Sequence, residues 1–182
     1  MTVKKIIGEC LTKMGERDFM DNAQYSETEQ GLIDSLLAAL NIVYREVVCE
    51  YLPLVHSESV TFCDGVLYIS SLEKKILYPI RVMQGENVVS FKAYADRITA
   101  KISGAATVEY AHMPDSELTL TSVVSDLRLT PSALSDGTLG EYYFANKVFD
   151  LARSYDTSFR EKMGLLRYKG RRLRLKERRW QA

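Results

Sequence analysis

The spacing of hydrophobic residues changes twice along this chain, and this change limits the folds that the sequence can adopt. Up to about residue 53, apolar side chains recur every three to four residues, as in a helix with one buried face. From about Ser59 to Ala111 they recur every second residue, as in strands, and after residue 137 the helical spacing returns. The sequence therefore predicts an α+β fold. In this fold, helices from both ends of the chain pack together and a small antiparallel β-sheet or sandwich is inserted between them.

Two helices are predicted in the N-terminal part. The first covers residues 3–14, with Thr2 as its N-cap and Gly15 at its end. The second begins at a capping box, in which the Ser26 hydroxyl and the Glu29 carboxylate satisfy N–H groups that the helix leaves free. Its long apolar stripe predicts a helix of about 24 residues, or about 36 Å. This stripe is broad, so we expect part of it to bind a second copy of the chain.

The middle of the chain is predicted to form about five strands. Asp64-Gly65 lies between two short apolar runs and favours the type I′ turn of a hairpin, because both residues accept positive φ angles. Pro79 has no N–H group, so its strand is expected to lie at an edge or to carry a bulge. Beyond the hairpin, strands are predicted at residues 76–83, 88–95, 97–102 and 106–111.

Residues 112–137 are predicted to be a connector, because groups of turn-forming residues such as Ser135-Asp136-Gly137 punctuate them. Within the connector, Thr130-Pro131 is expected to start one short helical turn. A second capping box, Thr138 with Glu141, predicts that a single last helix begins there and ends at Gly164. The side chains expected on its inner face are Leu139, Tyr142, Tyr143, Phe149, Ala152, Tyr155, Phe159 and Met163.

Charge is distributed unevenly along a chain whose net charge is zero. Residues 160–182 carry ten Lys or Arg and two Glu, a charge of +8, so the first 159 residues carry −8. A basic end on an acidic body favours pairing with another protein or with a polyanion. The predicted parts are an N-terminal helical part (1–57), a β-rich insertion (58–111), a connector and late helix (112–164) and a basic C-terminal arm (165–182).

The sequence lacks the common motifs of enzymes, such as a Gly-x-Ser-x-Gly elbow, a phosphate-binding loop or a dinucleotide-type glycine cluster. Its histidines, His56 and His112, have no second His or Cys three or four residues away, and we expect them to be exposed or internally satisfied. His56 and Cys63 are expected to be able to meet in space, but two ligands do not make a zinc site. We therefore predict no catalytic residue, no metal site and no cofactor. A small enzyme or ligand-binding domain is nevertheless retained as an alternative function, after the two that are given below.

The three cysteines are odd in number and widely spaced, which favours reduced core residues of a protein made in the cytoplasm. They are Cys10, Cys49 and Cys63. The sequence has no apolar run of about 18 residues and no signal peptide at its start, so we expect no membrane contact.

The basic arm combines arginines with an apolar edge and the single tryptophan of the chain. Leu173 and Leu175 alternate with basic residues, as in a strand, and a tryptophan such as Trp180 is a frequent interface anchor. We expect the arm to be mobile in the isolated subunit and to dock on another protein, for example by strand addition. A solvated basic end and a nucleic-acid clamp are the alternatives. The expected docking residues are Arg171, Arg172, Leu173, Arg174, Leu175, Arg178, Arg179 and Trp180.

The order of these elements resembles head–tail connector proteins of tailed bacteriophages, also called adaptor, head-completion or tail tubular A-type proteins. The resemblance covers most of the chain in architecture and includes the segments Val108–Pro114 and Phe159–Lys162. The resemblance also includes a late helix with the run Leu139-Gly140-Glu141-Tyr142-Tyr143-Phe144-Ala145-Asn146-Lys147-Val148-Phe149. Its closest part is the late segment that runs from Glu117-Leu118-Thr119 through a short proline turn into a helix and then Phe159-Arg160-Glu161-Lys162.

The resemblance implies a virion protein of the phage neck, assembled in the cytoplasm of the host bacterium. Its copies would form a ring, typically a dodecamer in that family, beneath the portal protein. The ring would extend the DNA channel and receive the next tail component, and a C-terminal extension would dock on the portal. In this chain the extension is short and rich in arginine, so channel DNA is a second candidate contact. The alternative function is a nucleic-acid-binding accessory domain that uses the basic tail.

Overall fold

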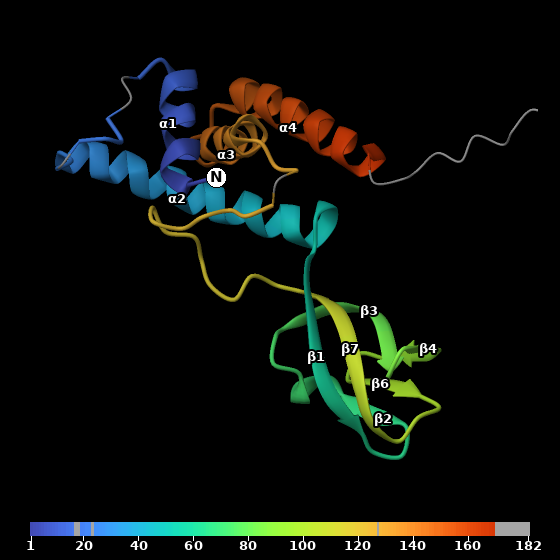
Figure 1. Ribbon diagram of the computed structural model, residues 1–182. Helices are drawn as coiled ribbons and strands as arrows, with labels where there is room; N and C mark the ends of the chain where they lie inside the picture. The colour runs from blue at the N-terminus through green and yellow to red at the C-terminus, as the bar shows by residue number, and fades with distance from the viewer. Residues whose placement is uncertain (17–18, 23, 127, 170–182) are drawn as a thin grey trace, which may run out of the picture. The chain divides into compact units, whose positions relative to one another are not determined.

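The computed structural model describes residues 1–16, 19–22, 24–126 and 128–169 (Figure 1). It confirms the predicted α+β class, with helices near both ends of the chain and antiparallel sheets between them. The chain divides into two compact units. The helical unit contains residues 1–43 and the described residues from 118 onward, and the β unit contains Tyr44–Glu117.

The first two helices begin where their capping residues predict. In α1 (Val3–Met14), the Thr2 hydroxyl accepts a hydrogen bond from the Lys5 N–H, and Gly15 ends the helix in the left-handed conformation with φ 79°. The capping box before α2 (Glu27–Glu46) is also present. The Ser26 N–H donates to Glu29 Oε2 at 2.7 Å, and the Glu29 N–H donates to Ser26 Oγ at 3.3 Å.

The end of the second helix differs from an ideal α-helix. The 20 residues of α2 are followed by a π-helical turn of five residues, Val47–Tyr51. The two segments together match the predicted length of about 24 residues, but no residue pattern predicted the wider turn.

The third helix, α3 (Pro131–Ala145), begins earlier than predicted. Thr130 is its N-cap and Pro131 its first residue, so this pair starts a full helix rather than a single turn. The predicted connector residues Ser135-Asp136-Gly137 and the predicted cap Thr138 therefore lie inside the helix, where they are buried. The Thr138 hydroxyl donates to the Leu134 carbonyl one turn earlier, so it caps nothing.

Two glycines of α3 serve close packing rather than a turn. A Cβ atom added to Gly137 would lie 2.7 Å from Val43 Cγ1 of α2 and 3.0 Å from the Phe159 ring. At Gly140 it would lie 3.3 Å from the backbone nitrogen of Asp156. Glycine-containing runs of this kind usually indicate a turn. Here the glycines are needed because Val43, Asp156 and Phe159, which are distant in the sequence, pack closely against the helix.

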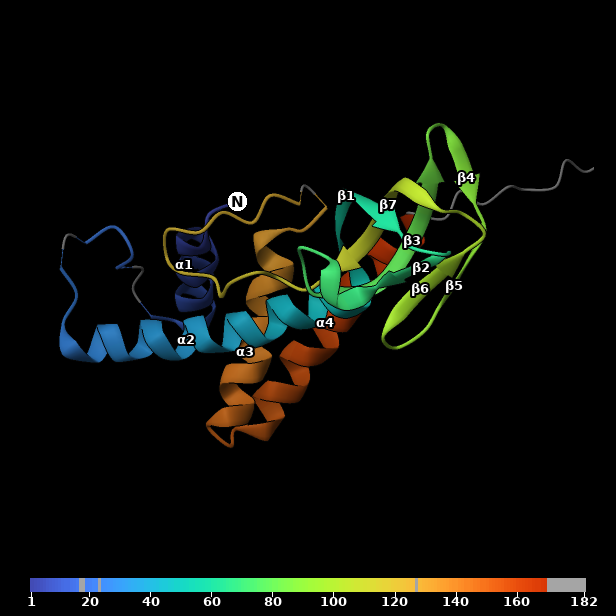
Figure 2. The same cartoon turned by 90° about the horizontal axis from the view of Figure 1, so that it is seen from below.

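The late helix predicted as one element is two helices. α3 and α4 (Phe149–Lys169) form a hairpin joined at residues 146–148, where Lys147 has φ 62° (Figure 2). The helix continues through Gly164 instead of ending there. Ala152, Phe159 and Met163 are buried as predicted, but Phe149 is 59% exposed because it stands at the tip of the hairpin.

The β unit has seven strands in two antiparallel sheets. The strand order is β1-β7-β3-β4 in one sheet and β2-β6-β5 in the other. The two sheets contribute to one hydrophobic core, which includes Phe62, Val82, Ile98 and Val108. The strands are β1 (Leu54–Phe62), β2 (Val66–Tyr68), β3 (Ile76–Gln84), β4 (Asn87–Val89), β5 (Phe91–Ala93), β6 (Arg97–Ala100) and β7 (Gly104–His112).

The structure confirms the predicted turn and bulge, but several strands begin or end at other residues than predicted. Asp64 and Gly65 have φ 51° and 78°, as a type I′ turn requires, and β3 shifts register on both sides of Pro79. However, β1 begins at Leu54 rather than near Ser59, and it pairs along its length with β7. The predicted strand at 88–95 is split between β4 and β5, which belong to different sheets.

The β unit is inserted into the helical unit between residues 43 and 118. On the helical side, the Asn41 side chain binds both backbone groups of Leu118, accepting from its N–H at 2.6 Å and donating to its carbonyl at 3.1 Å. On the β side, Arg45 and Glu117 form an ion pair of 3.4 Å. The segment that leaves the helical unit, near residue 43, and the segment that returns to it, near residue 118, therefore lie close to each other. Within the described residues, no helix is sufficiently long and apolar to cross a membrane.

Candidate functional site

All eight predicted docking residues, from Arg171 to Trp180, lie outside the described residues. The described part of the chain offers three other features: a buried ion cluster in the helical unit, a histidine–carboxylate cluster in the β unit and an apolar surface at one helix hairpin.

The ion cluster is centred on Asp136 of α3, which is 4% exposed. Lys13 Nζ of α1 lies 2.5 Å from one carboxylate oxygen, and Lys162 Nζ of α4 lies 2.5 Å from the other. The Ser158 hydroxyl donates to the second oxygen at 2.6 Å. Burial works against ionisation of this carboxyl, but the hydrogen bonds from Lys13, Lys162 and Ser158 outweigh it and hold the pKa of Asp136 below its usual value. The cluster is saturated by its own partners and ties three helices together, so we interpret it as structural.

The cysteines differ in their surroundings. Cys10 is buried beside α3, and burial raises the pKa of its thiol to about 12, which makes it a poor nucleophile. Cys63 is exposed, so the prediction that all three cysteines are core residues is wrong for this one. The strand ends after Phe62, and Cys63 opens the turn beyond it.

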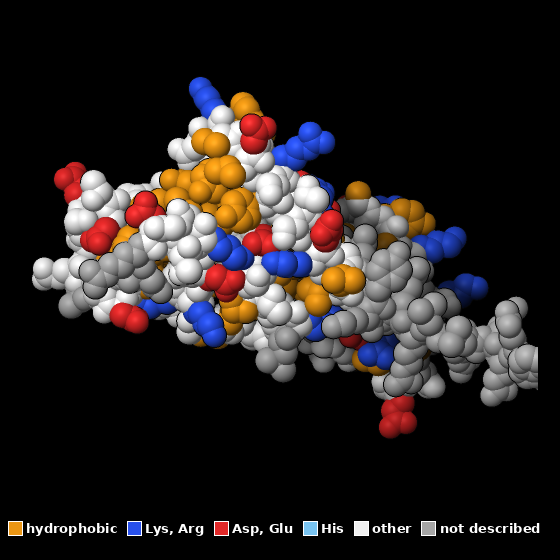
Figure 3. Space-filling model, turned by 90° about the horizontal axis from the view of Figure 1, so that it is seen from above, with side chains coloured by type: hydrophobic (Ala, Val, Ile, Leu, Met, Phe, Trp, Pro, Cys, Tyr) orange, Lys and Arg blue, Asp and Glu red, His pale blue; other side chains and the backbone are white. Residues whose placement is uncertain are grey.

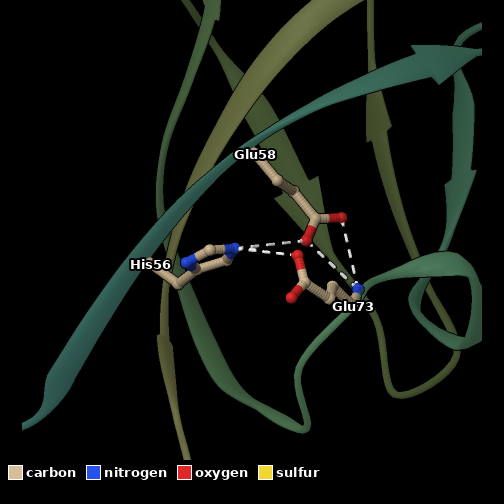
Figure 4. A group of neighbouring side chains, drawn as sticks. All are labelled: His56, Glu58 and Glu73. Carbon is tan, nitrogen blue, oxygen red and sulfur yellow. Dashed lines mark hydrogen bonds and ion pairs between the residues drawn. The ribbon is translucent and has the colours of Figure 1, made fainter.

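The histidine–carboxylate cluster consists of His56, Glu58 and Glu73 (Figure 4). His56 and Glu58 are two residues apart on β1, so their side chains point to the same face of the strand. Glu73 comes from the loop between the short 3₁₀ helix Ile69–Ser71 and β3. The Glu73 N–H donates to Glu58 Oε2 at 3.1 Å, and the Lys74 N–H donates to the Tyr110 hydroxyl at 3.2 Å. These two bonds fix the loop over the strand.

One ring nitrogen of this cluster is unusual. His56 Nε2 lies 3.5 Å from Glu73 Oε2 and 3.7 Å from Glu58 Oε2, and the three donor atoms all lie within 4.8 Å of one another. Of the buried side-chain nitrogen and oxygen atoms in the described residues, His56 Nε2 is the one that has no hydrogen-bond partner. The expectation that His56 is either exposed or internally satisfied therefore does not describe this nitrogen.

Tyr110 completes the surroundings of the cluster. Its ring lies edge-on to the His56 ring, with centroids 5.7 Å apart, and its hydroxyl donates to Glu58 Oε2 at 2.8 Å. Burial, followed by the hydrogen bond to Glu58, raises the pKa of Tyr110 to about 12, so the hydroxyl remains a donor at neutral pH.

Cys63 does not contribute to this cluster, contrary to the expectation that it and His56 can meet. The two residues are seven positions apart along an extended segment, which corresponds to about 23 Å, and an odd separation places them on opposite faces.

The apolar surface lies at the tip of the α3–α4 hairpin. Phe144 is 63% exposed and Phe149 is 59% exposed, and their rings contact each other edge-to-face at 5.8 Å. Val148 and Leu151 extend this surface, which we call the hairpin-tip patch. Figure 3 shows hydrophobic side chains gathered on the face of the helical unit that carries α3 and α4. Such a contiguous exposed apolar surface is typical of a protein contact.

An open depression of about 600 Å³ runs along β5 and β6 in the β unit. The charged side chains that line it, Asp64, Lys92 and Lys101, are all exposed. Exposed charges on flexible side chains are not held in place for a ligand, so this depression adds no candidate site.

Comparison with known proteins adds no family to this description: no family model matches the chain, and no curated protein matches it.

Proposed function

We propose that this chain is a structural subunit of a bacteriophage head–tail connector, which assembles as a ring beneath the portal protein. Two features support the proposal. The first is the arrangement of a helical unit that carries an inserted β unit, which agrees with the architecture expected from the resemblance. The second, on which the proposal mainly depends, is the hairpin-tip patch.

The patch supports assembly because it is costly to a subunit that stays alone. Phe144 and Phe149 expose most of their rings to water, although the same two helices bury Leu139, Phe159 and Met163 efficiently. Burying apolar surface contributes about 25 cal/mol per Å², so covering two aromatic side chains is worth several kcal/mol to a complex. We assign the patch to contact with a second copy of the chain.

The helical unit also changes where the contact between copies is expected. The sequence pointed to the broad stripe of the second helix. In the structure that stripe is largely used inside the subunit, since Ile33, Leu36, Leu40 and Val43 are buried. The large apolar side chain of α2 that stays exposed is Ile42. The hairpin-tip patch therefore replaces α2 in the proposal.

The test compares the wild-type chain with the double variant Phe144→Ser/Phe149→Ser. Sedimentation velocity and negative-stain imaging should show rings of the wild-type protein, either alone or when it is mixed with the portal protein of its phage. The double variant should remain monomeric at the same concentration. Val88→Ser removes an equally exposed apolar side chain from β4 and should assemble like the wild type. A wild-type protein that stays monomeric and does not bind its portal would refute the connector proposal.

The nucleic-acid alternative predicts a different dependence on the arm. Replacing Arg171, Arg172, Arg178 and Arg179 with Ala would then lower DNA affinity and flatten its dependence on salt concentration. In the connector proposal, Trp180→Ala should weaken docking on the portal by about 2 kcal/mol, as expected for an anchor residue. The helix α4 continues to Lys169, so an arm truncation for this comparison should remove residues 170–182 and leave the helix intact.

A further inference from the structure

We propose that His56, Glu58 and Glu73 bind one divalent transition-metal ion, with Zn²⁺ as the best match. The proposal concerns the β unit alone and does not depend on the connector function. It starts from a contrast: a buried ring nitrogen without a hydrogen bond faces two carboxylate groups that lie beside each other.

The donor types suit such an ion. A neutral imidazole nitrogen and carboxylate oxygens are ordinary Zn²⁺ ligands, and three protein ligands leave a fourth position for water. The imidazole also distinguishes the site from a Mg²⁺ or Ca²⁺ site, because these ions prefer oxygen ligands alone.

The distances fit shared coordination better than hydrogen bonding. Around a tetrahedral Zn²⁺ with bonds of about 2.0–2.1 Å, neighbouring ligand atoms are about 3.3 Å apart. His56 Nε2 lies 3.5 Å from Glu73 Oε2 and 3.7 Å from Glu58 Oε2, which is close to this spacing. A hydrogen bond from a ring nitrogen to oxygen is typically 2.7–3.2 Å, so both separations are too long for one.

The surroundings of Glu58 hold this ligand in place before an ion arrives. Glu58 receives the Tyr110 hydroxyl at 2.8 Å and the Glu73 N–H at 3.1 Å, so its carboxylate is oriented by two donors. Such partners of a metal ligand fix its orientation and are a regular part of metal sites. Two carboxylates held this close also repel each other, and a divalent cation between them removes that repulsion.

His112 is close but does not belong to the ligand set. Its ring centroid lies 6.1 Å from that of His56, and its Nδ1 is 2.7 Å from the Met113 carbonyl. A competing explanation for the cluster is an ion pair of the His56 ring with both carboxylates. This explanation requires no metal, and the experiment separates the two.

The experiment measures Zn²⁺ binding to the full chain without an affinity tag, by isothermal titration calorimetry, and Co²⁺ binding by its visible absorption. We expect one ion per chain and a rise in melting temperature with Zn²⁺, because an ion that binds the folded state stabilises it. Glu73→Gln should lower the affinity at least tenfold, because even the loss of a residue that only orients a metal ligand typically costs about 10–100-fold. The Glu73 side chain is exposed and the variant keeps the N–H that binds Glu58, so the fold should be unaffected.

Two further variants make the result specific. Glu86→Gln makes the same chemical change at an exposed turn of the β unit and should leave Zn²⁺ affinity unchanged. Cys63→Ser removes the exposed thiol, and binding should persist in that background. Equal affinities of the wild-type and Glu73→Gln proteins would overturn the proposal. So would the absence of saturable binding up to about 1 mM Zn²⁺, a concentration that corresponds to a binding free energy of only about −4 kcal/mol.

Discussion

The two polar clusters of this protein have opposite compositions. In the helical unit, the carboxylate of Asp136 faces the ammonium groups of Lys13 and Lys162. In the β unit, the imidazole of His56 faces the carboxylates of Glu58 and Glu73. The first cluster satisfies its buried atoms from within, while the second leaves a buried nitrogen without a hydrogen bond. Burial of a polar group is therefore explained by folding alone only where its hydrogen-bond partners are complete. Where they are incomplete, as at His56 Nε2, the proposed metal ion would supply the missing partner.

The largest effect should come from breaking the complete cluster. Asp136→Ala leaves two lysine ammonium groups in a partly buried site without their carboxylate, so we expect a loss of about 3 kcal/mol in the free energy of unfolding. Urea denaturation followed by circular dichroism measures it. Glu117→Gln, which removes one partner of an exposed ion pair, should cost less than about 1 kcal/mol. Similar losses for the two variants would contradict the structural role of Asp136.

The same variant has a pH signature. Because the pKa of Asp136 is lower in the folded protein, its stabilising contribution is complete above the unfolded value of about 3.9. The contribution is lost as the pH falls through the folded pKa. The stability difference between the wild-type protein and Asp136→Ala should therefore be constant near neutral pH and narrow below about pH 4.

A smaller effect is expected from the packing next to Asp136. Gly137→Ala adds a Cβ that would lie 2.7 Å from Val43 Cγ1, and we expect a net loss of about 1–2 kcal/mol from overpacking. Gly31→Ala is the matched control, because a Cβ there meets nothing within 4 Å on α2. That variant should gain up to about 1 kcal/mol from helix propensity. Thermal denaturation of both proteins gives the comparison, and a stabilised Gly137→Ala variant would show that α3 has room to move.

The smallest effect tests the incomplete cluster. Tyr110→Phe removes the hydroxyl that donates to Glu58 and accepts from the Lys74 N–H, and should cost about 1 kcal/mol without metal. If the cluster binds Zn²⁺, the same change should also weaken that binding, because Glu58 loses one of the groups that orient it. Tyr78→Phe, at an exposed position of β3, should change neither quantity. Calorimetric titration and denaturation of the same samples measure both quantities.

The sequence was sufficient for features that depend on near neighbours. The caps of α1 and α2 and the Asp64-Gly65 turn each involve residues within four positions of one another, so their chemistry is visible in the sequence itself. The α+β class followed from the two hydrophobic periods, which also act over short distances. The same local signals placed the start of the last helix wrongly, because Gly137 and Thr138 have turn and cap chemistry but long-range reasons to be in a helix.

The candidate site required contacts that the sequence does not display. His56 and Glu58 lie two residues apart on one strand and so share a face. This pair could be predicted only if β1 was expected to begin at Leu54. Glu73 is 15 residues from Glu58, and a loop that two backbone hydrogen bonds hold in place brings it there. The partners of Asp136 are more distant still, since Lys13 is 123 residues away. In neither cluster can the sequence spacing of two members be used to predict the position of the next one.

The closure of the helical unit at Asn41 has an evolutionary consequence. Asn41 binds the backbone of Leu118, so the segments that leave and re-enter this unit are fastened together on the helical side. A recombination event that exchanged the sequence between residues 44 and 117 for another domain with neighbouring ends would leave that fastening untouched. We therefore expect related chains to differ more in the inserted domain than in the helices. Related chains should show this contrast as a conserved frame around a variable centre.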